Sequence, residues 1–440
     1  MVVSYQIIRL RSVWSDWRRL LLFAAIFGGS CVRFYVAVTL NPAQHIWSDP
    51  ARHWHNAATL LTRNPLSGMD PLTYQIWLMV VADVIKVCPR AVGPYAGLLS
   101  VLTPWLWYRF LRELLPTKFL ALIGYALFCW LPSWIGIFSY FMTETLILPL
   151  LGASLWFTWR CLRKATLESF VWSTMFWIAT LMTKQSLVPI AFIAVAWLWI
   201  SQKDRGRRAV IAILMTTAVL IPAGLRVQII LGVWAPLGYS KLNQIYMDSG
   251  NASIEVRFTR HNQEWGLWRF LSPSMNTQPL APFSQWESQR VGTCRFTVDI
   301  ANGSRDWDAA LQEQEPSFAA RIEHQCENVI FLLLGTSWPD NNPAYLWDRA
   351  ANACRWIWAP LLVIVFISNG IMLWRFRKWN LLPVLTMLGW LFLCGAPMGV
   401  GEGRYRKPFE GLLIANALWL AAAKHESTRT SVFDQSRITS

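Results

Sequence analysis

The sequence predicts an all-α polytopic membrane protein with about ten transmembrane helices, an interfacial helix region in the first external loop and a mixed α/β or irregular external segment. Of the 440 residues, 54% are hydrophobic and 15% are charged, so most of the apolar surface must face lipid. The 40 Lys and Arg residues, against 25 Asp and Glu, cluster between apolar runs, as cytoplasmic loops require. This placement explains the positive charge without a nucleic-acid partner.

The first span is expected from Leu20 to Leu40, about the length that a bilayer needs. Arg9, Arg11, Arg18 and Arg19 precede it, which places the amino terminus in the cytoplasm. The run is longer than the apolar region of a signal peptide, so we expect it to stay uncleaved.

Residues 41–91 are expected to form the first external loop. Its first part, Asn41–Thr73, is polar and is predicted to carry a short helix that begins at Asp49. The apolar stretch Tyr74–Val87 is short and contains Asp83 and Lys86, which favours an interfacial or re-entrant helix over a crossing.

Further spans then alternate across the bilayer and complete an amino-terminal module over residues 1–231. They are expected near Val92–Phe110, Phe119–Tyr140, Leu146–Trp159, Phe170–Thr183, Leu187–Ile200 and Ala209–Leu231. A hydrophilic external segment follows at residues 232–355. Residues 356–424 hold three carboxy-terminal spans, and residues 425–440 form a cytoplasmic tail. The basic clusters between spans then lie inside, as the positive-inside rule requires.

The external segment contains two of the eight cysteines, Cys294 and Cys326. In an oxidising compartment they are candidates for a disulfide, and the alternative is two free thiols. The remaining cysteines lack metal-ligand spacing, so no cysteine metal site is predicted.

Four basic residues lie on the outer side of the predicted topology, against the rule. They are Lys184 and the group Arg404, Arg406 and Lys407 in Gly401–Pro408. Ionisable groups near a bilayer are costly, which makes an anion site the functional hypothesis. Flanking glycines and two arginines favour phosphate oxygens as the ligand. The alternative is that these side chains are interfacial anchors of the last span.

Two acidic residues share that outer side, and each has a structural alternative. Asp49 before Pro50 is a usual helix start, and Glu144 after Thr143 is a usual first-turn acid. Both are also candidate site residues. His53 lies four residues after Asp49 on the same helical face, but a metal pair has no evident third ligand, so no metal site is predicted.

The run Asp49–Leu61 resembles the first external loop of the GT-C glycosyltransferases, polytopic enzymes that include the bacterial lipid A aminoarabinose transferase and the protein O-mannosyltransferases. Similar stretches follow at Phe141–Glu144, Leu181–Gln185 and Gly401–Pro408, so the resemblance covers Leu20 to about Leu231 and the last two spans. This chain departs from the pattern where His53 replaces the usual Tyr and Pro50 replaces a second acid.

The resemblance implies a glycosyltransferase of the bacterial inner membrane with an extracytoplasmic active site. The donor would be a polyprenyl-phosphate sugar, with its phosphate held by Lys184, Arg404 and Arg406. Asp49 would be the general base on an acceptor hydroxyl of a glycan, lipid or protein, and direct displacement would invert the anomeric carbon. Glu144, His53, Glu402 and Tyr405 would orient the sugar or the cationic side chains. No cofactor or divalent metal is expected to be required.

Two other functions fit the same features. A transporter or flippase of a lipid-linked saccharide would bind the phosphate without breaking a bond, although the sequence shows no duplicated half with paired broken helices. A catalytically silent member of the family would act as an assembly factor.

Overall fold

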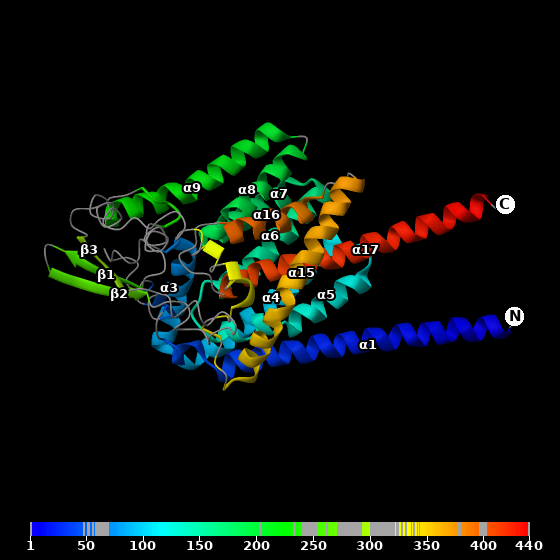
Figure 1. Ribbon diagram of the computed structural model, residues 1–440, viewed down its shortest axis with the longest axis horizontal. Helices are drawn as coiled ribbons and strands as arrows, with labels where there is room; N and C mark the ends of the chain where they lie inside the picture. Colours follow the sequence, from blue (N-terminus) through cyan, green and yellow to red (C-terminus); the bar gives the residue numbers. More distant parts are fainter. Residues whose placement is uncertain are drawn as a thin grey trace.

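The computed structural model describes residues 2–46, 49–50, 53–54, 57, 70–202, 204–231, 234–238, 253–260, 263–270, 293–299, 322, 325–326, 329–330, 332–335, 337, 339–340, 342, 344–376, 380–395 and 403–438. Helices dominate these residues, and the amino-terminal ones form the body of the molecule (Figure 1). They are α1 (Val2–Thr39), α3 (Leu72–Val87), α4 (Val92–Leu114), α5 (Lys118–Trp130), α6 (Glu144–Lys164), α7 (Leu167–Leu181), α8 (Val188–Ile200) and α9 (Arg205–Leu231).

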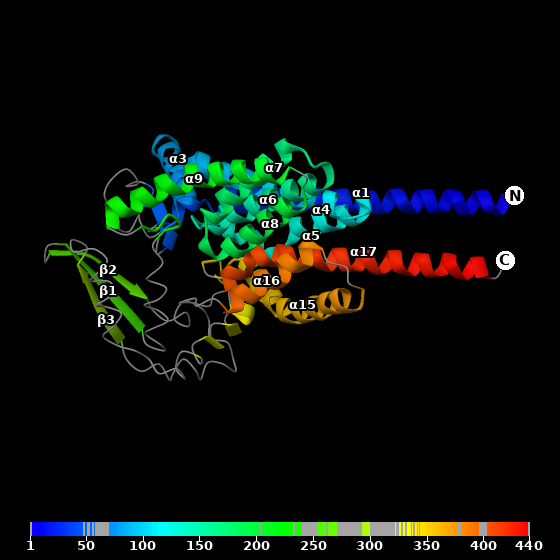
Figure 2. The same cartoon turned by 90° about the horizontal axis from the view of Figure 1, so that it is seen from above.

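The carboxy-terminal part adds α15 (Leu346–Phe376), α16 (Leu381–Gly395) and α17 (Lys407–Ile438). Short 3-10 helices lie between the long ones, at η1 (Pro42–Gln44), η3 (Pro89–Ala91), η4 (Pro132–Trp134), η5 (Gly136–Ser139), η6 (Gln185–Leu187) and η7 (Gly403–Arg406). The amino-terminal end of α1 and the carboxy-terminal end of α17 project from the same end of the molecule in both views (Figure 1, Figure 2).

A three-stranded sheet lies at the opposite end, within the segment predicted to be external. Its strands are β1 (Ser253–Arg260), β2 (Gln263–Phe270) and β3 (Thr293–Asp299), in the order β2-β1-β3. β1 pairs antiparallel with β2 and parallel with β3.

The chain is a helical membrane protein, but the prediction of about ten spans is too high. Among the described residues, four helices are long and apolar enough to cross a bilayer: Trp17–Gln44, Glu144–Lys164, Arg205–Ile230 and Leu346–Trp374. A fifth crossing is counted only if Lys118–Trp130 and Pro132–Ser139, which bend by 62° at their junction, form one broken span.

Length explains most of the difference. A straight crossing needs about 20 helical residues, whereas α7 has 15, α8 has 13 and α16 has 15. Apolar composition alone had predicted a span at each of them. The segment predicted to be interfacial or re-entrant is the 16-residue helix α3, which is not among the four candidates.

The core is built around Trp107 of α4. Its indole Nε1 donates to the carbonyl of Leu148 on α6 at 2.9 Å, and its ring lies 5.3 Å from that of Trp134. A Cβ added at Gly152 of α6 or Gly411 of α17 would come within 2.7 Å and 2.5 Å of the Trp107 ring. Glycine is therefore required at both positions, because the two helices approach the indole closely.

Arg33 of α1 is buried and forms hydrogen bonds on both sides of the break between α5 and η4. The Arg33 guanidinium donates to the carbonyls of Ser100, Phe128 and Trp134 at 2.8, 3.2 and 2.9 Å. These carbonyls include groups that a broken helix leaves without an intrahelical donor. Arg33 thus fixes the position of η4, which contributes to the network described below.

Candidate functional site

Asp49 and Arg404 meet although 355 residues separate them. The Arg404 Nη2 donates to the Asp49 Oδ2 at 3.0 Å. Asp49 is helical and precedes Pro50, as predicted, while Arg404 lies in η7, immediately before α17. The Arg404 side chain is 9% exposed and the Asp49 side chain is 25% exposed, so this ion pair lies at the edge of the buried interior.

The ring of Tyr405 joins this pair to a second cation. The Arg404 Cζ lies 5.0 Å from the ring centroid, and the Lys184 Nζ lies 4.1 Å from it. The Arg404 Nη2 also lies 3.2 Å from the Tyr405 hydroxyl oxygen. An aromatic face attracts a cation, so the ring holds two positive side chains that would otherwise repel each other.

Glu144 balances the second cation. Its Oε1 accepts from the Lys184 Nζ at 2.5 Å, and its Oε2 accepts from the Thr143 hydroxyl at 3.2 Å. Glu144 is fully buried at the first position of α6, where the helix dipole favours a carboxylate. It also interacts electrostatically with Arg404. We call Asp49, Arg404, Tyr405, Lys184 and Glu144 the charged cluster.

A polar layer adjoins the charged cluster through Tyr74. The Tyr74 side chain is fully buried and interacts electrostatically with Glu144 and Asp70, and burial raises its pKa well above the usual value. His53 is buried, with its ring edge toward Tyr74 at 5.2 Å and its Nδ1 3.4 Å from the Asp70 Oδ2. The described contacts of His53 are therefore with this polar layer, which adjoins the charged cluster through Tyr74.

Asp70 and Arg226 are polar residues of this region that the sequence analysis did not select. Arg226 interacts electrostatically with Asp70, and its Nη2 donates to Gln75 at 3.4 Å. Both had a signal in the sequence. Asp70 precedes Pro71, which repeats the Asp-Pro pair of the same loop, and Arg226 interrupts an otherwise apolar run.

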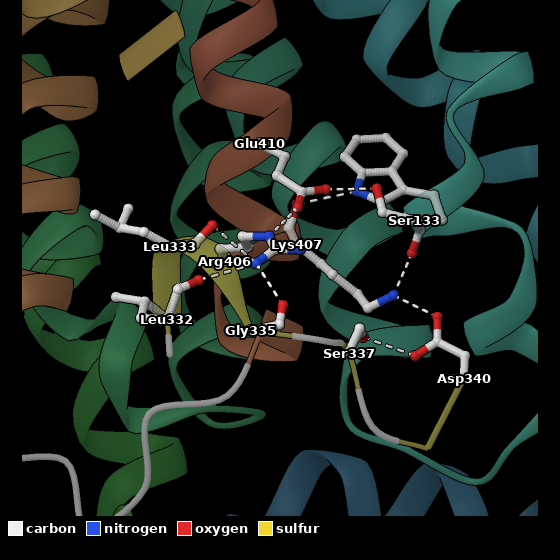
Figure 3. Close-up of polar contacts among 10 residues, drawn as sticks. Ser133, Leu332, Leu333, Gly335, Ser337, Asp340, Arg406, Lys407 and Glu410 are labelled. Atoms are coloured by element: carbon white, nitrogen blue, oxygen red, sulfur yellow. Dashed lines mark hydrogen bonds and ion pairs between the residues drawn. The ribbon is translucent and has the colours of Figure 1, made fainter. Parts of the chain in front are cut away.

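Arg406 was predicted to bind phosphate beside Arg404, but the structure uses it elsewhere. Its Nε donates to Glu410 at 2.9 Å, and its Nη1 lies 3.0, 3.2 and 3.0 Å from the carbonyls of Leu332, Leu333 and Gly335 (Figure 3). The side chain is 2% exposed, and burial lowers its pKa. Its charge is therefore committed to Glu410 and to carbonyls where the helical residues 332–334 end.

Lys407 extends the same network in another direction (Figure 3). Its Nζ donates to the Asp340 Oδ2 at 2.5 Å and to the carbonyl of Ser133. The Ser133 hydroxyl donates to Glu410 at 2.5 Å. We call Arg406, Lys407, Glu410, Asp340 and Ser133 the buried network. It ties the start of α17 to η4 and to the 332–340 segment, and so fixes the adjacent Arg404 and Tyr405.

Two predicted site residues, Glu402 and Cys294, have side chains outside the described part of the chain. Glu402 lies outside the described residues, and only the backbone of Cys294 is described. Cys326 is an exposed free thiol. Among the residues that the structure describes, no three or more His, Cys, Asp or Glu side chains form a group able to hold a metal ion.

No protein-family model matches this chain, and a search of curated proteins finds no match either.

Proposed function

We propose that this chain is a membrane glycosyltransferase that moves a sugar from a polyprenyl-phosphate donor to an acceptor hydroxyl, on the extracytoplasmic face of a bacterial inner membrane. One observation supports this function above the others: the acid of the first loop and the arginine before the last long helix lie 3.0 Å apart. A second ion pair, Lys184 with Glu144, lies on the same tyrosine ring.

The cations suit the leaving group. When the anomeric C–O bond breaks, both electrons of that bond go to the polyprenyl phosphate oxygen, and the developing charge needs positive partners more than a proton. Arg404 and Lys184 supply two positive charges near one another. Arg406 is no longer part of this assignment, because Glu410 and three carbonyls use its guanidinium.

Asp49 suits the attacking group. The acceptor oxygen forms a new bond to the anomeric carbon while its proton passes to the Asp49 carboxylate. Displacement in one step from the face opposite the phosphate inverts that carbon, and it needs one carboxylate near the reacting atoms. Glu144 keeps Lys184 in position, and Tyr405 positions both cations. We assign to His53, which contacts Asp70 in the polar layer, the role of orienting the sugar.

The test is transfer by the purified full-length protein in nanodiscs, supplied with radiolabelled polyprenyl-phosphate sugars and a panel of glycan and lipid acceptors. We expect Asp49→Asn to lower the transfer rate by about 10²–10⁴-fold, the usual contribution of a general base. The matched control is Glu113→Gln, which removes a carboxylate from the Arg163 pair elsewhere in the molecule and should leave the rate unchanged. Transfer by Asp49→Asn at the wild-type rate would remove Asp49 from the mechanism.

A second measurement separates transfer from transport. A transporter would move the labelled lipid across the bilayer intact, whereas a transferase releases polyprenyl phosphate in step with glycosylated product. Detection of translocated, uncleaved donor with no released polyprenyl phosphate would replace the proposed function with transport.

A further inference from the structure

Asp49 occupies the position on Arg404 that an anionic ligand would take. Its carboxylate lies 3.0 Å from the Arg404 Nη2, the separation expected of a charge-assisted hydrogen bond to an oxyanion. A carboxylate held by arginine is a poor proton acceptor, because the positive charge stabilises its ionised form. In the observed arrangement Asp49 is therefore paired with Arg404 and is poorly suited to accept a proton.

We propose that the phosphate of the donor displaces the Asp49 carboxylate from Arg404, so that Asp49 is released to act as a base only when a donor is bound. This inference rests on the proposed function and adds an order of events to it. The ligand chemistry is a phosphate ester, and the internal carboxylate of Asp49 is its competitor.

The exposure of the two carboxylates indicates which one leaves. The Glu144 side chain is 1% exposed, and it accepts hydrogen bonds from both Lys184 and Thr143 at the start of a long helix. The Asp49 side chain is 25% exposed and lies in the first loop. Moving Asp49 toward water breaks its hydrogen bond to Arg404 but returns the carboxylate to solvent, whereas moving Glu144 would break two hydrogen bonds deep inside the protein.

The charge balance gives the same result. Arg404 and Lys184 carry two positive charges, and Asp49 and Glu144 carry two negative charges, so the charged cluster is neutral. A phosphodiester brings one further negative charge into a site where Arg404 and Glu144 are buried. Such a charge is costly unless it is paired. Outward movement of Asp49 restores the balance and leaves the phosphate paired with Arg404.

The two partners of the exchange make opposite predictions for phosphate binding, which provides the test. Binding of a short-chain prenyl phosphate and of inorganic phosphate would be measured on the full-length protein in nanodiscs. We expect Asp49→Asn to bind prenyl phosphate about fivefold more tightly than wild type, a change of about 1 kcal/mol, because the competing charge is gone. Arg404→Ala should lose most of this affinity, and Glu113→Gln should match wild type.

Equal or weaker binding by Asp49→Asn would overturn the exchange. Asp49→Ala is the second variant, since it removes the competing carboxylate without placing an amide beside Arg404, and it should also bind more tightly. Size-exclusion elution at the wild-type volume shows that each variant is folded.

The two proposals fail in different ways. Tighter binding by Asp49→Asn, with no transfer by wild type from any polyprenyl-phosphate sugar, would support the exchange and contradict the glycosyltransferase. Asp49-dependent transfer without tighter binding by Asp49→Asn would support the glycosyltransferase and contradict the exchange. Inorganic phosphate that binds as tightly as prenyl phosphate would identify free phosphate as the competitor of Asp49 and remove the lipid from the proposal.

Discussion

Replacing Lys407 with methionine tests the buried network most directly. The ammonium of Lys407 is fully buried, and it donates to the Asp340 carboxylate at 2.5 Å and to the Ser133 carbonyl. Methionine nearly matches the length of lysine but carries no charge and no donor. The substitution therefore leaves Asp340, which is also fully buried, without its ion-pair partner.

The structure sets the size of the effect. Removing one partner from a buried ion pair costs about 3–5 kcal/mol, since the remaining charge is left uncompensated. Ser337 still donates to the Asp340 Oδ1 at 2.7 Å and retains part of the stabilisation of the carboxylate. The matched comparison is Arg163→Met, which breaks a pair of 3.4 Å whose side chains are 52% and 21% exposed. That change should cost less than about 1 kcal/mol.

The measurement is thermal unfolding of the purified protein in detergent, followed by the fluorescence of its 28 tryptophans. We expect Lys407→Met to lower the unfolding midpoint several times more than Arg163→Met does. Adding Asp340→Asn to Lys407→Met removes the orphaned charge and should recover at least half of the loss. Equal unfolding temperatures for Lys407→Met and Arg163→Met would contradict the cost assigned to the buried ion pair, and so would a double variant no more stable than Lys407→Met.

Three further outcomes follow from the same contacts. Gly136→Ala should destabilise by about 1–3 kcal/mol in the same unfolding assay, since its Cβ would lie 2.6 Å from the Asp348 Oδ1, whereas Gly370→Ala, with nothing within 4 Å, should stay within about 1 kcal/mol of wild type. Asp70→Asn should slow transfer about tenfold by loosening His53 and leave the affinity for prenyl phosphate unchanged. A large loss of that affinity would contradict the separation of the polar layer from the charged cluster. EDTA should leave the transfer rate unchanged, because Arg404 and Lys184 supply the positive charge, and inhibition that Mg²⁺ reverses would refute this assignment.

Every member of the charged cluster was a site candidate in the sequence. Basic residues on the outer side of the predicted topology are costly, and this argument selected Lys184 and Arg404 together with Arg406 and Lys407. Asp49 and Glu144 were selected because each is an acid at a predicted helix start on that same side of the predicted topology. The structure brings Lys184 and Arg404 together with these two acids around Tyr405. The argument succeeded for Lys184 and Arg404 because a cation near a bilayer needs a counter-charge, which Glu144 and Asp49 supply.

The sequence did not predict that Arg404 and Arg406 have different partners. Two arginines separated by one residue were predicted to bind one phosphate together. In η7, a 3-10 helix with three residues per turn, positions two apart project in directions about 120° apart. Arg404 therefore contacts Asp49 while Arg406 contacts Glu410. Closeness along the chain had been taken for closeness in space.

The predicted number of membrane spans was wrong for a related reason. Hydropathy reports whether a residue avoids water, and the interior of a helical bundle satisfies this as well as lipid does. α16 is apolar along its length, but residues such as Leu382, Leu385 and Trp390 are fully buried against other helices. The helices α7, α8 and α16 are too short for a straight crossing, and apolar composition alone does not distinguish such buried helices from spans.

The position of the buried network next to the charged cluster limits how the site can respond to a ligand. Arg404 and Tyr405 lie directly before Arg406 and Lys407, and these two side chains are fixed by Glu410, Asp340 and backbone carbonyls. Lys184 is held by a fully buried glutamate. The cations are thus anchored, and Asp49 is the most exposed acid or base of the charged cluster. An arriving phosphate therefore meets fixed positive charges and one displaceable negative charge, so the response should be confined to the first loop. Hydrogen exchange with and without prenyl phosphate should change there and stay constant at the start of α17, and a change of similar size at both places would contradict this view.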